Sequence, residues 1–223
     1  MNPEFWHQRW QRGEIGWHAE DFNRHLAEHW PRLGVPASQR VFVPLCGKSL
    51  DMLWLAGRGH RVLGVELSEL AARAFCEDNG LTPEIVDEPP FRRYRIDEVE
   101  LLVGDFFALT PAHLDGVTAC FDRASLIALP PELRPRYARH LAGLLPGGAL
   151  SLLVSLDYDK SRMSGPPFAV TREEVLELFA PAFEIEPLAT FDALVESPKF
   201  RERGLERMIE HVYRLRRRAG PDS

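Results

Sequence analysis

The sequence of 223 residues has few cysteines and no long apolar run, and each scarcity excludes a class of protein. Its three cysteines, Cys46, Cys76 and Cys120, are an odd number at irregular spacing. This argues against a disulfide framework and against a Cys-x-x-Cys metal site. The longest apolar runs, residues 41–46 and 149–156, are far shorter than the roughly twenty residues that cross a bilayer. We therefore expect a cytoplasmic protein in a reducing setting, with no membrane partner and no bound metal.

Basic residues are also too few for a general nucleic-acid role, because polyanion binding relies on clustered Lys and Arg. The formal net charge is −6, and the one basic run, residues 214–218, has no interleaved aromatic residue. We interpret this run as the solvated end of a strand. The first six residues lack the basic start and apolar centre of a secretory signal. The expected partner is a small molecule, and the expected oligomeric state is a monomer.

Short apolar runs alternate with segments of helical spacing, which predicts an α/β fold with a mostly parallel sheet covered on both faces. The predicted strands are residues 41–45, 61–66, 99–103, 117–122 and 150–155. The predicted helices between them are residues 49–58, 68–79 and 132–145.

The last third predicts a helix over residues 171–180, where Thr171 and Glu174 match a capping box. Residues 183–190 and 211–215 complete a predicted Rossmann-like sheet of seven strands with an antiparallel terminal strand, and residues 197–207 are expected to be irregular. We expect one domain over residues 1–223. Residues 1–38 would form a helical extension covering the site, and residues 219–223 a disordered tail.

Four of the five tryptophans lie in the N-terminal extension. Trp6 and Trp10 stand four apart, which is typical of one helix face. For Trp6 and Trp30 we expect packing on the sheet. Trp10 and Trp17 border a polar turn that contains glycine, where an aromatic ring can close over a ligand.

Ligands of an open parallel sheet bind at the carboxyl ends of its strands. The first predicted strand is followed by Gly47, whose lack of a side chain lets the backbone approach a ligand. The second ends in Glu66 and Leu67, about twenty residues further on, the spacing at which a carboxylate binds ribose hydroxyls. Asp105 and Phe106 follow the third strand, and Asp122 and Arg123 end the fourth. These residues predict a nucleoside site.

The glycine motifs that bind phosphate groups are missing from the turn that contains Gly47. Gly-x-Gly-x-x-Gly is absent, and Phe42 stands where a triphosphate loop ending in Gly47 needs its first glycine. A nucleoside without phosphates remains, and S-adenosylmethionine is the commonest such cofactor. Its sulfonium would gain about 0.5 to 2 kcal/mol over an aromatic face, for which Trp10 is the candidate. A nicotinamide-dependent oxidoreductase and a non-catalytic nucleoside-binding module are the alternatives.

Several segments resemble the thiopurine S-methyltransferase family, particularly its bacterial branch, in the family's order and over nearly the whole chain. They are residues 4–10, 16–18, 43–49 (Val-Pro-Leu-Cys-Gly-Lys-Ser), 57–68, 104–107, 122–126 and 200–204. The resemblance implies a class I methyltransferase that transfers methyl groups from S-adenosylmethionine, leaving S-adenosylhomocysteine. Its implied substrates are small aromatic or heterocyclic thiols such as thiopurines. Bacterial relatives are also associated with selenium and tellurium compounds, and hence with tellurite and selenium detoxification.

The resemblance further implies roles for single residues. Cofactor contacts fall on Trp10, Leu45, Glu66 and Arg123, with Phe106 near the adenine; Trp17 and Arg203 would lie by the substrate. We expect in-line displacement governed by positioning.

Three side chains near these segments have roles that the sequence leaves open. Arg123 would pair with the cofactor carboxylate or draw electron density toward an anionic substrate. Asp122 is a tentative proton acceptor or a structural acid at a strand end. Cys46, next to an expected helix start, is a thiol of lowered pKa or a packing residue.

Overall fold

The computed structural model describes residues 3–15, 18–195, 198–202 and 204–219 of the chain. It contains two compact units, Met1–Phe121 and Asp122–Ser223, which are described in turn. The expectation of one domain stays a prediction.

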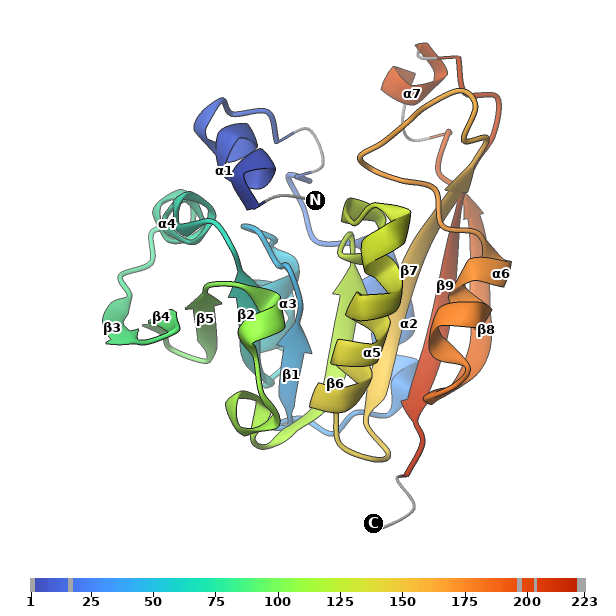
Figure 1. Cartoon of the computed structure of the whole chain (residues 1–223). Helices are drawn as coiled ribbons and strands as arrows, with labels where there is room; N and C mark the ends of the chain where they lie inside the picture. Colours follow the sequence, from blue (N-terminus) through green and yellow to red (C-terminus); the bar gives the residue numbers. More distant parts are fainter. Residues whose placement is uncertain (1–2, 16–17, 196–197, 203, 220–223) are drawn as a thin grey trace. The chain divides into compact units, whose positions relative to one another are not determined.

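The first unit is built on a sheet whose middle is parallel. Its strands run in the order β3-β4-β5-β2-β1-β6 (Figure 1). β2 pairs in parallel with β1 and β5, β1 pairs in parallel with β6, and β4 is antiparallel to both β3 and β5. The bounds are β1 Arg40–Val43, β2 Arg61–Glu66, β3 Glu84–Glu88, β4 Phe91–Ile96, β5 Val99–Val103 and β6 Val117–Arg123, whose last two residues enter the second unit.

Four α-helices accompany these strands in the described part of the first unit: α1 (Pro3–Gln11), α2 (Arg24–Leu33), α3 (Asp51–Gly57) and α4 (Glu69–Asp78). Short 3-10 turns, η1 (Phe106–Ala108) and η2 (Pro111–Leu114), follow β5. The side chain of Asn23 caps α2 by accepting from the backbone amides of His25 and Leu26. Trp30 is 3% exposed in α2, which confirms its expected packing role.

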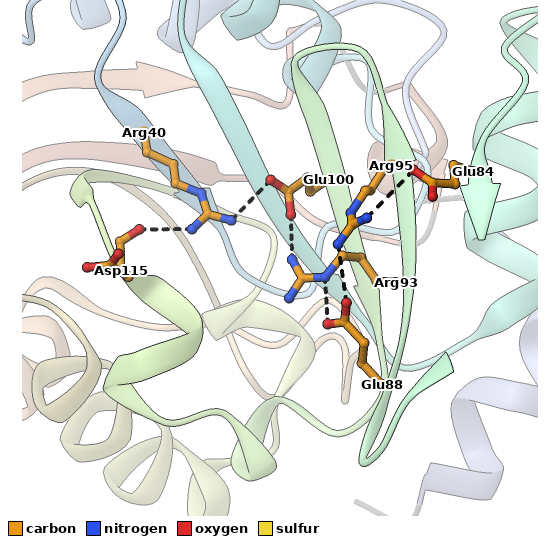
Figure 2. A network of polar contacts seen from close by, with 7 residues as sticks. All are labelled: Arg40, Glu84, Glu88, Arg93, Arg95, Glu100 and Asp115. Atoms are coloured by element: carbon orange, nitrogen blue, oxygen red, sulfur yellow. Dashed lines mark hydrogen bonds and ion pairs between the residues drawn. The ribbon is translucent and has the colours of Figure 1, made fainter. Parts of the chain in front are cut away.

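The count of seven strands was wrong: the described residues form nine, six in the first unit and three in the second. The unpredicted strands are β3 and β4, a hairpin that carries charges in place of an apolar run. Its side chains and their neighbours form the network of Figure 2, in which Arg93 bonds both Glu88 and Glu100. The full set is Arg40, Glu84, Glu88, Arg93, Arg95, Glu100 and Asp115. Ion pairs and antiparallel bonds thus hold strands that hydrophobic periodicity does not reveal.

The second unit contains an antiparallel set in the order β7-β9-β8, with β7 at Leu150–Tyr158, β8 at Phe183–Asp192 and β9 at Met208–Arg217. β9 pairs antiparallel with both neighbours, which confirms the predicted antiparallel terminal strand. The helices are α5 (Arg134–Leu144), α6 (Arg172–Phe179) and α7 (Pro198–Glu202), with 3-10 turns η3 (Leu126–Ala128) and η4 (Pro131–Leu133). The segment expected to be irregular therefore includes a short helix.

Acidic side chains of β8 form ion pairs with the basic run at the end of β9. Arg214 pairs with Glu186 at 3.3 Å, and Arg218 with Glu184 at 3.9 Å. Arg217 donates to the carbonyl oxygens of Ala142 and Ala182. These contacts agree with a strand end.

The α/β class and its mostly parallel sheet with antiparallel additions are confirmed. Across the described ranges of the chain, no helix has the length and apolar character needed to span a bilayer.

Candidate functional site

In the first unit the loop after β1 is joined to the end of β2 through a carboxylate. Glu66 Oε2 accepts from the backbone amide of Gly47 at 2.9 Å, and its Oε1 accepts from that of Ser68 at 2.8 Å. The amide of Cys46 donates to the carbonyl of Val65 at 3.0 Å. The spacing of Gly47 and Glu66, which suggested a ribose site, thus corresponds to a direct contact.

Glu66 is 7% exposed, and burial raises the pKa of its carboxyl group. Hydrogen bonds from the amides of Ser68, Gly47 and Leu67 oppose that rise. A carboxylate has about four lone-pair sites, more than these amides use. The group can therefore accept a further hydrogen bond from a hydroxyl of a ligand.

Backbone geometry brings the same loop close to aromatic surface. Gly47 has φ +54°, and Leu45 has φ +45°, a left-handed conformation that is costly for a side chain of its size. A methyl group on Gly47 would lie 3.5 Å from Cζ2 of Trp10, so the Trp10 ring of α1 lies over this glycine. The Trp10 ring thus lies against the glycine whose amide Glu66 holds.

The end of β5 lies next to Glu66 as well, because the amide of Gly104 donates to the Glu66 carbonyl at 2.9 Å. Asp105 uses its carboxylate to accept from the amide of Phe107 at 2.9 Å, which caps η1. Phe106 is 3% exposed and stacks against Phe42 with a centroid distance of 6.5 Å. Its side chain therefore belongs to the core, and Phe107 is the more exposed ring of this turn.

Cys46, which follows Leu45 in the same loop, is buried. The thiol is 7% exposed, and burial, with a contribution from Glu66, raises its pKa. α3 begins at Asp51 rather than beside the thiol, so no helix terminus lowers the pKa. The Sγ atom lies 2.8 Å from where a methyl group on Gly64 would stand. Of the two roles that the sequence left open, the raised pKa argues against a thiol of lowered pKa, and burial favours packing.

In the second unit, Asp122 is enclosed at the end of β6. It is 2% exposed, and its Oδ2 accepts from the hydroxyl of Tyr137 at 2.7 Å. Burial raises its pKa to about 6, against smaller opposite effects of Tyr137, Ser125 and the Leu126 amide. Its other oxygen, Oδ1, has no hydrogen-bond partner within the described residues.

Arg123 is the last residue of β6 and is half-buried. Ala124, directly after it, has φ +67°, a strained conformation for a residue with a side chain. Trp17 and Arg203, the two predicted substrate residues, lie outside the described residues.

Two residues near the site were not predicted from the sequence. Asp51 is 2% exposed and accepts from the backbone amide of Asn23. Tyr137, the partner of Asp122, carries no motif. For Asp51, the sequence offers one indication: it stands close to Ser49 at the start of the predicted helix of residues 49–58.

A solved structure shares the fold of this chain. The chain matches the structure of Burkholderia thailandensis 1,6-didemethyltoxoflavin-N1-methyltransferase, with bound 1,6-didemethyltoxoflavin and S-adenosylhomocysteine, at a TM-score of 0.62. Identity is 19%, over 97% of this chain and 87% of that one. The fold is therefore one that methyltransferases use.

The family follows from closer relatives. The family model described as thiopurine S-methyltransferase matches residues 1–218. A thiopurine S-methyltransferase of Pseudomonas fluorescens (strain Pf0-1) is 52% identical over 97% of this chain and 99% of its own length. One of Azotobacter vinelandii is 50% identical over 98% and 100%. The chain belongs to the thiopurine S-methyltransferase family and is a methyltransferase.

Proposed function

We propose that this protein transfers a methyl group from S-adenosylmethionine to the sulfur of a small aromatic or heterocyclic thiol, thiopurines among them. The observation that carries the proposal is the buried Glu66 carboxylate, held by the amides of Ser68 and of Gly47, over which the Trp10 ring lies. The names of the relatives at 52% and 50% identity support the thiol as acceptor.

The residues of the first unit fit the adenosine part of this cofactor. Glu66 would accept hydrogen bonds from the ribose hydroxyls at the lone-pair sites that its amide partners leave free. Leu67 follows Glu66 in the sequence, Leu45 stands two positions before Gly47, and both would supply apolar contact. Asp105 and Phe106 would border the adenine, the latter through its backbone.

When bound, S-adenosylmethionine supplies a methyl group on a positively charged sulfur, and S-adenosylhomocysteine remains after transfer. Trp10 would present its ring face to that charge, worth on the order of 0.5 to 2 kcal/mol. Arg123 would pair with the cofactor carboxylate. Fixed placement by these side chains can lower the barrier by several kcal/mol without a covalent intermediate on the enzyme.

The acceptor side rests on Trp17 and Arg203, which would contact the thiol or its anion. A thiolate is already a capable nucleophile, so the protein needs to hold it rather than to activate it strongly. Asp122 as a direct proton acceptor stays a prediction. Its burial and its bond to Tyr137 favour an indirect role through the backbone of Arg123.

Methyl transfer from labelled S-adenosylmethionine to a panel of heterocyclic thiols, selenite and tellurite tests the proposal. Transfer to at least one heterocyclic thiol is expected; no product from any thiol would contradict it. Products from selenite or tellurite would extend the substrate range to those elements.

Thermal shift measurements separate the two alternatives. S-adenosylhomocysteine should stabilise the protein and NADH should not, because the loop holding Gly47 lacks the glycines of a pyrophosphate site. Stabilisation by NADH alone would indicate an oxidoreductase. Binding of S-adenosylhomocysteine without turnover of any acceptor would indicate a binding module.

A further inference from the structure

Asp51, the first residue of α3, uses both carboxylate oxygens inside the protein. Oδ1 accepts from the backbone amide of Asn23 at 2.6 Å, and Oδ2 accepts from the hydroxyl of Ser49 at 2.7 Å. The Ser49 oxygen in turn accepts from the amide of Asp51 at 3.2 Å. The side chain is 2% exposed, so water does not compete for these bonds.

Its partner Asn23 controls where α2 begins. The backbone of Asn23 is extended, with φ −68° and ψ 129°, and its side chain accepts from the amides of His25 at 2.9 Å and Leu26 at 3.4 Å. The one backbone donor of Asn23 is the group that Asp51 holds. The carboxylate therefore fixes the chain at the point where it enters α2.

The same loop is contacted again upstream, where the Trp10 ring lies over Gly47. The chain leaves α1 in a turn, with the amide of Gly13 bonded to the carbonyl of Trp10 at 3.2 Å. Twelve residues separate Trp10 from Asn23. Both ends of this stretch thus lie against the loop of residues 46–51.

An aromatic contact supports the downstream end. The ring of Phe22 lies 6.1 Å from that of Trp54 in α3, three residues beyond Asp51. Phe22 is 41% exposed, so this contact alone buries little area. The buried carboxylate is the specific part of the attachment.

We infer that Asp51 is a positioning residue. By binding Asn23, it attaches the segment that follows Trp10 to the loop of residues 46–51, and so holds the Trp10 ring in place over Gly47. The inference rests on the proposed function, because that loop is assigned there to the cofactor. Asp51 does not touch the reacting atoms. It acts through the backbone amide of Asn23 and through Ser49.

Calorimetric binding of S-adenosylhomocysteine to Asp51→Ala, Asp51→Asn and the parent protein tests the role. Asp51→Ala loses both bonds and should weaken binding at least about ten-fold, the scale of one hydrogen bond to a charged group. Asp51→Asn keeps one acceptor oxygen and should recover part of the affinity. With a thiol acceptor, KM for S-adenosylmethionine should rise while kcat at saturation stays within about three-fold of the parent value.

Asp78→Ala is the matched control. Asp78 accepts from Lys48 of the same loop at 2.7 Å, but its side chain is 52% exposed, and exposed pairs contribute little. Its affinity should stay within about two-fold of the parent value. An equal loss in Asp78→Ala and Asp51→Ala would show general loosening of the loop and overturn the specific role.

The remaining outcomes are distinguishable. Folded Asp51→Ala with parent affinity would overturn the role of Asp51 alone, whereas a parent protein that does not bind S-adenosylhomocysteine would overturn the proposed function with it. If Asp51→Ala does not fold, Asp51→Asn and Ser49→Ala decide. Parent affinity in both would refute the inference, and weakened affinity in both would support it.

Discussion

Replacing Asp122 by asparagine should change how the free energy of unfolding depends on pH. The carboxyl group is buried, and its pKa is raised from 3.8 to about 6 in the folded protein. Between these two pH values the folded protein holds a proton that the unfolded chain has released. The stabilising effect of that proton is fully present below 3.8 and is lost as the pH rises through 6.

The gap between 3.8 and about 6 corresponds to roughly 3 kcal/mol, at about 1.4 kcal/mol per pH unit. About 2 kcal/mol of this lies between about pH 4.5 and 7.5, the range in which urea unfolding can be followed. Asparagine is neutral throughout. The parent protein should therefore lose about 2 kcal/mol of stability as the pH rises across this range, and Asp122→Asn should not. The difference in free energy of unfolding, variant minus parent, should increase by that amount.

Urea unfolding of both proteins at half-unit pH steps measures the difference directly. All other titrating groups are shared, so their contributions cancel. A difference that stays constant to within about 0.5 kcal/mol would refute the argument that the buried carboxyl carries a raised pKa. Tyr137→Phe removes a hydroxyl that lowers this pKa, so the loss of stability should extend to higher pH.

Glu66→Ala should weaken S-adenosylhomocysteine binding about 100-fold in calorimetry, because two hydrogen bonds to a carboxylate are lost; unchanged affinity would refute the ribose assignment. Trp10→Ala should weaken S-adenosylmethionine more than uncharged S-adenosylhomocysteine, and equal losses would argue against a cation over the ring. Cys46 is buried with a raised pKa, so it should react with a disulfide reagent only on unfolding; rapid labelling of the native protein would contradict this. Gly104→Ala would place a methyl group 2.5 Å from Phe91 and should lower the free energy of unfolding by about 1 to 3 kcal/mol in urea titration, and an unchanged midpoint would show that the ring can move.

Much of the fold could be predicted from the sequence, because buried parallel strands and amphipathic helices have strong local periodicity. The runs at residues 41–45, 61–66 and 99–103 correspond to β1, β2 and β5 within two residues. The hairpin of β3 and β4 could not be found in this way. Its strands are held together by ion pairs such as that between Arg93 and Glu88. The sequence does not show which charged residues pair, because that depends on how the strands are aligned.

Part of the candidate site could likewise be predicted from the sequence, and part could not. The sequence by itself determined the pairing of a glycine turn with a carboxylate, since Gly47 and Glu66 lie at the ends of adjacent parallel strands whose spacing is set by one intervening helix. Tertiary structure alone decided which acids are buried. Asp51 binds an amide 28 residues away, and Asp122 a hydroxyl 15 residues away. Such contacts depend on how helices pack on the strands, and burial then sets the strength and the pKa of each group.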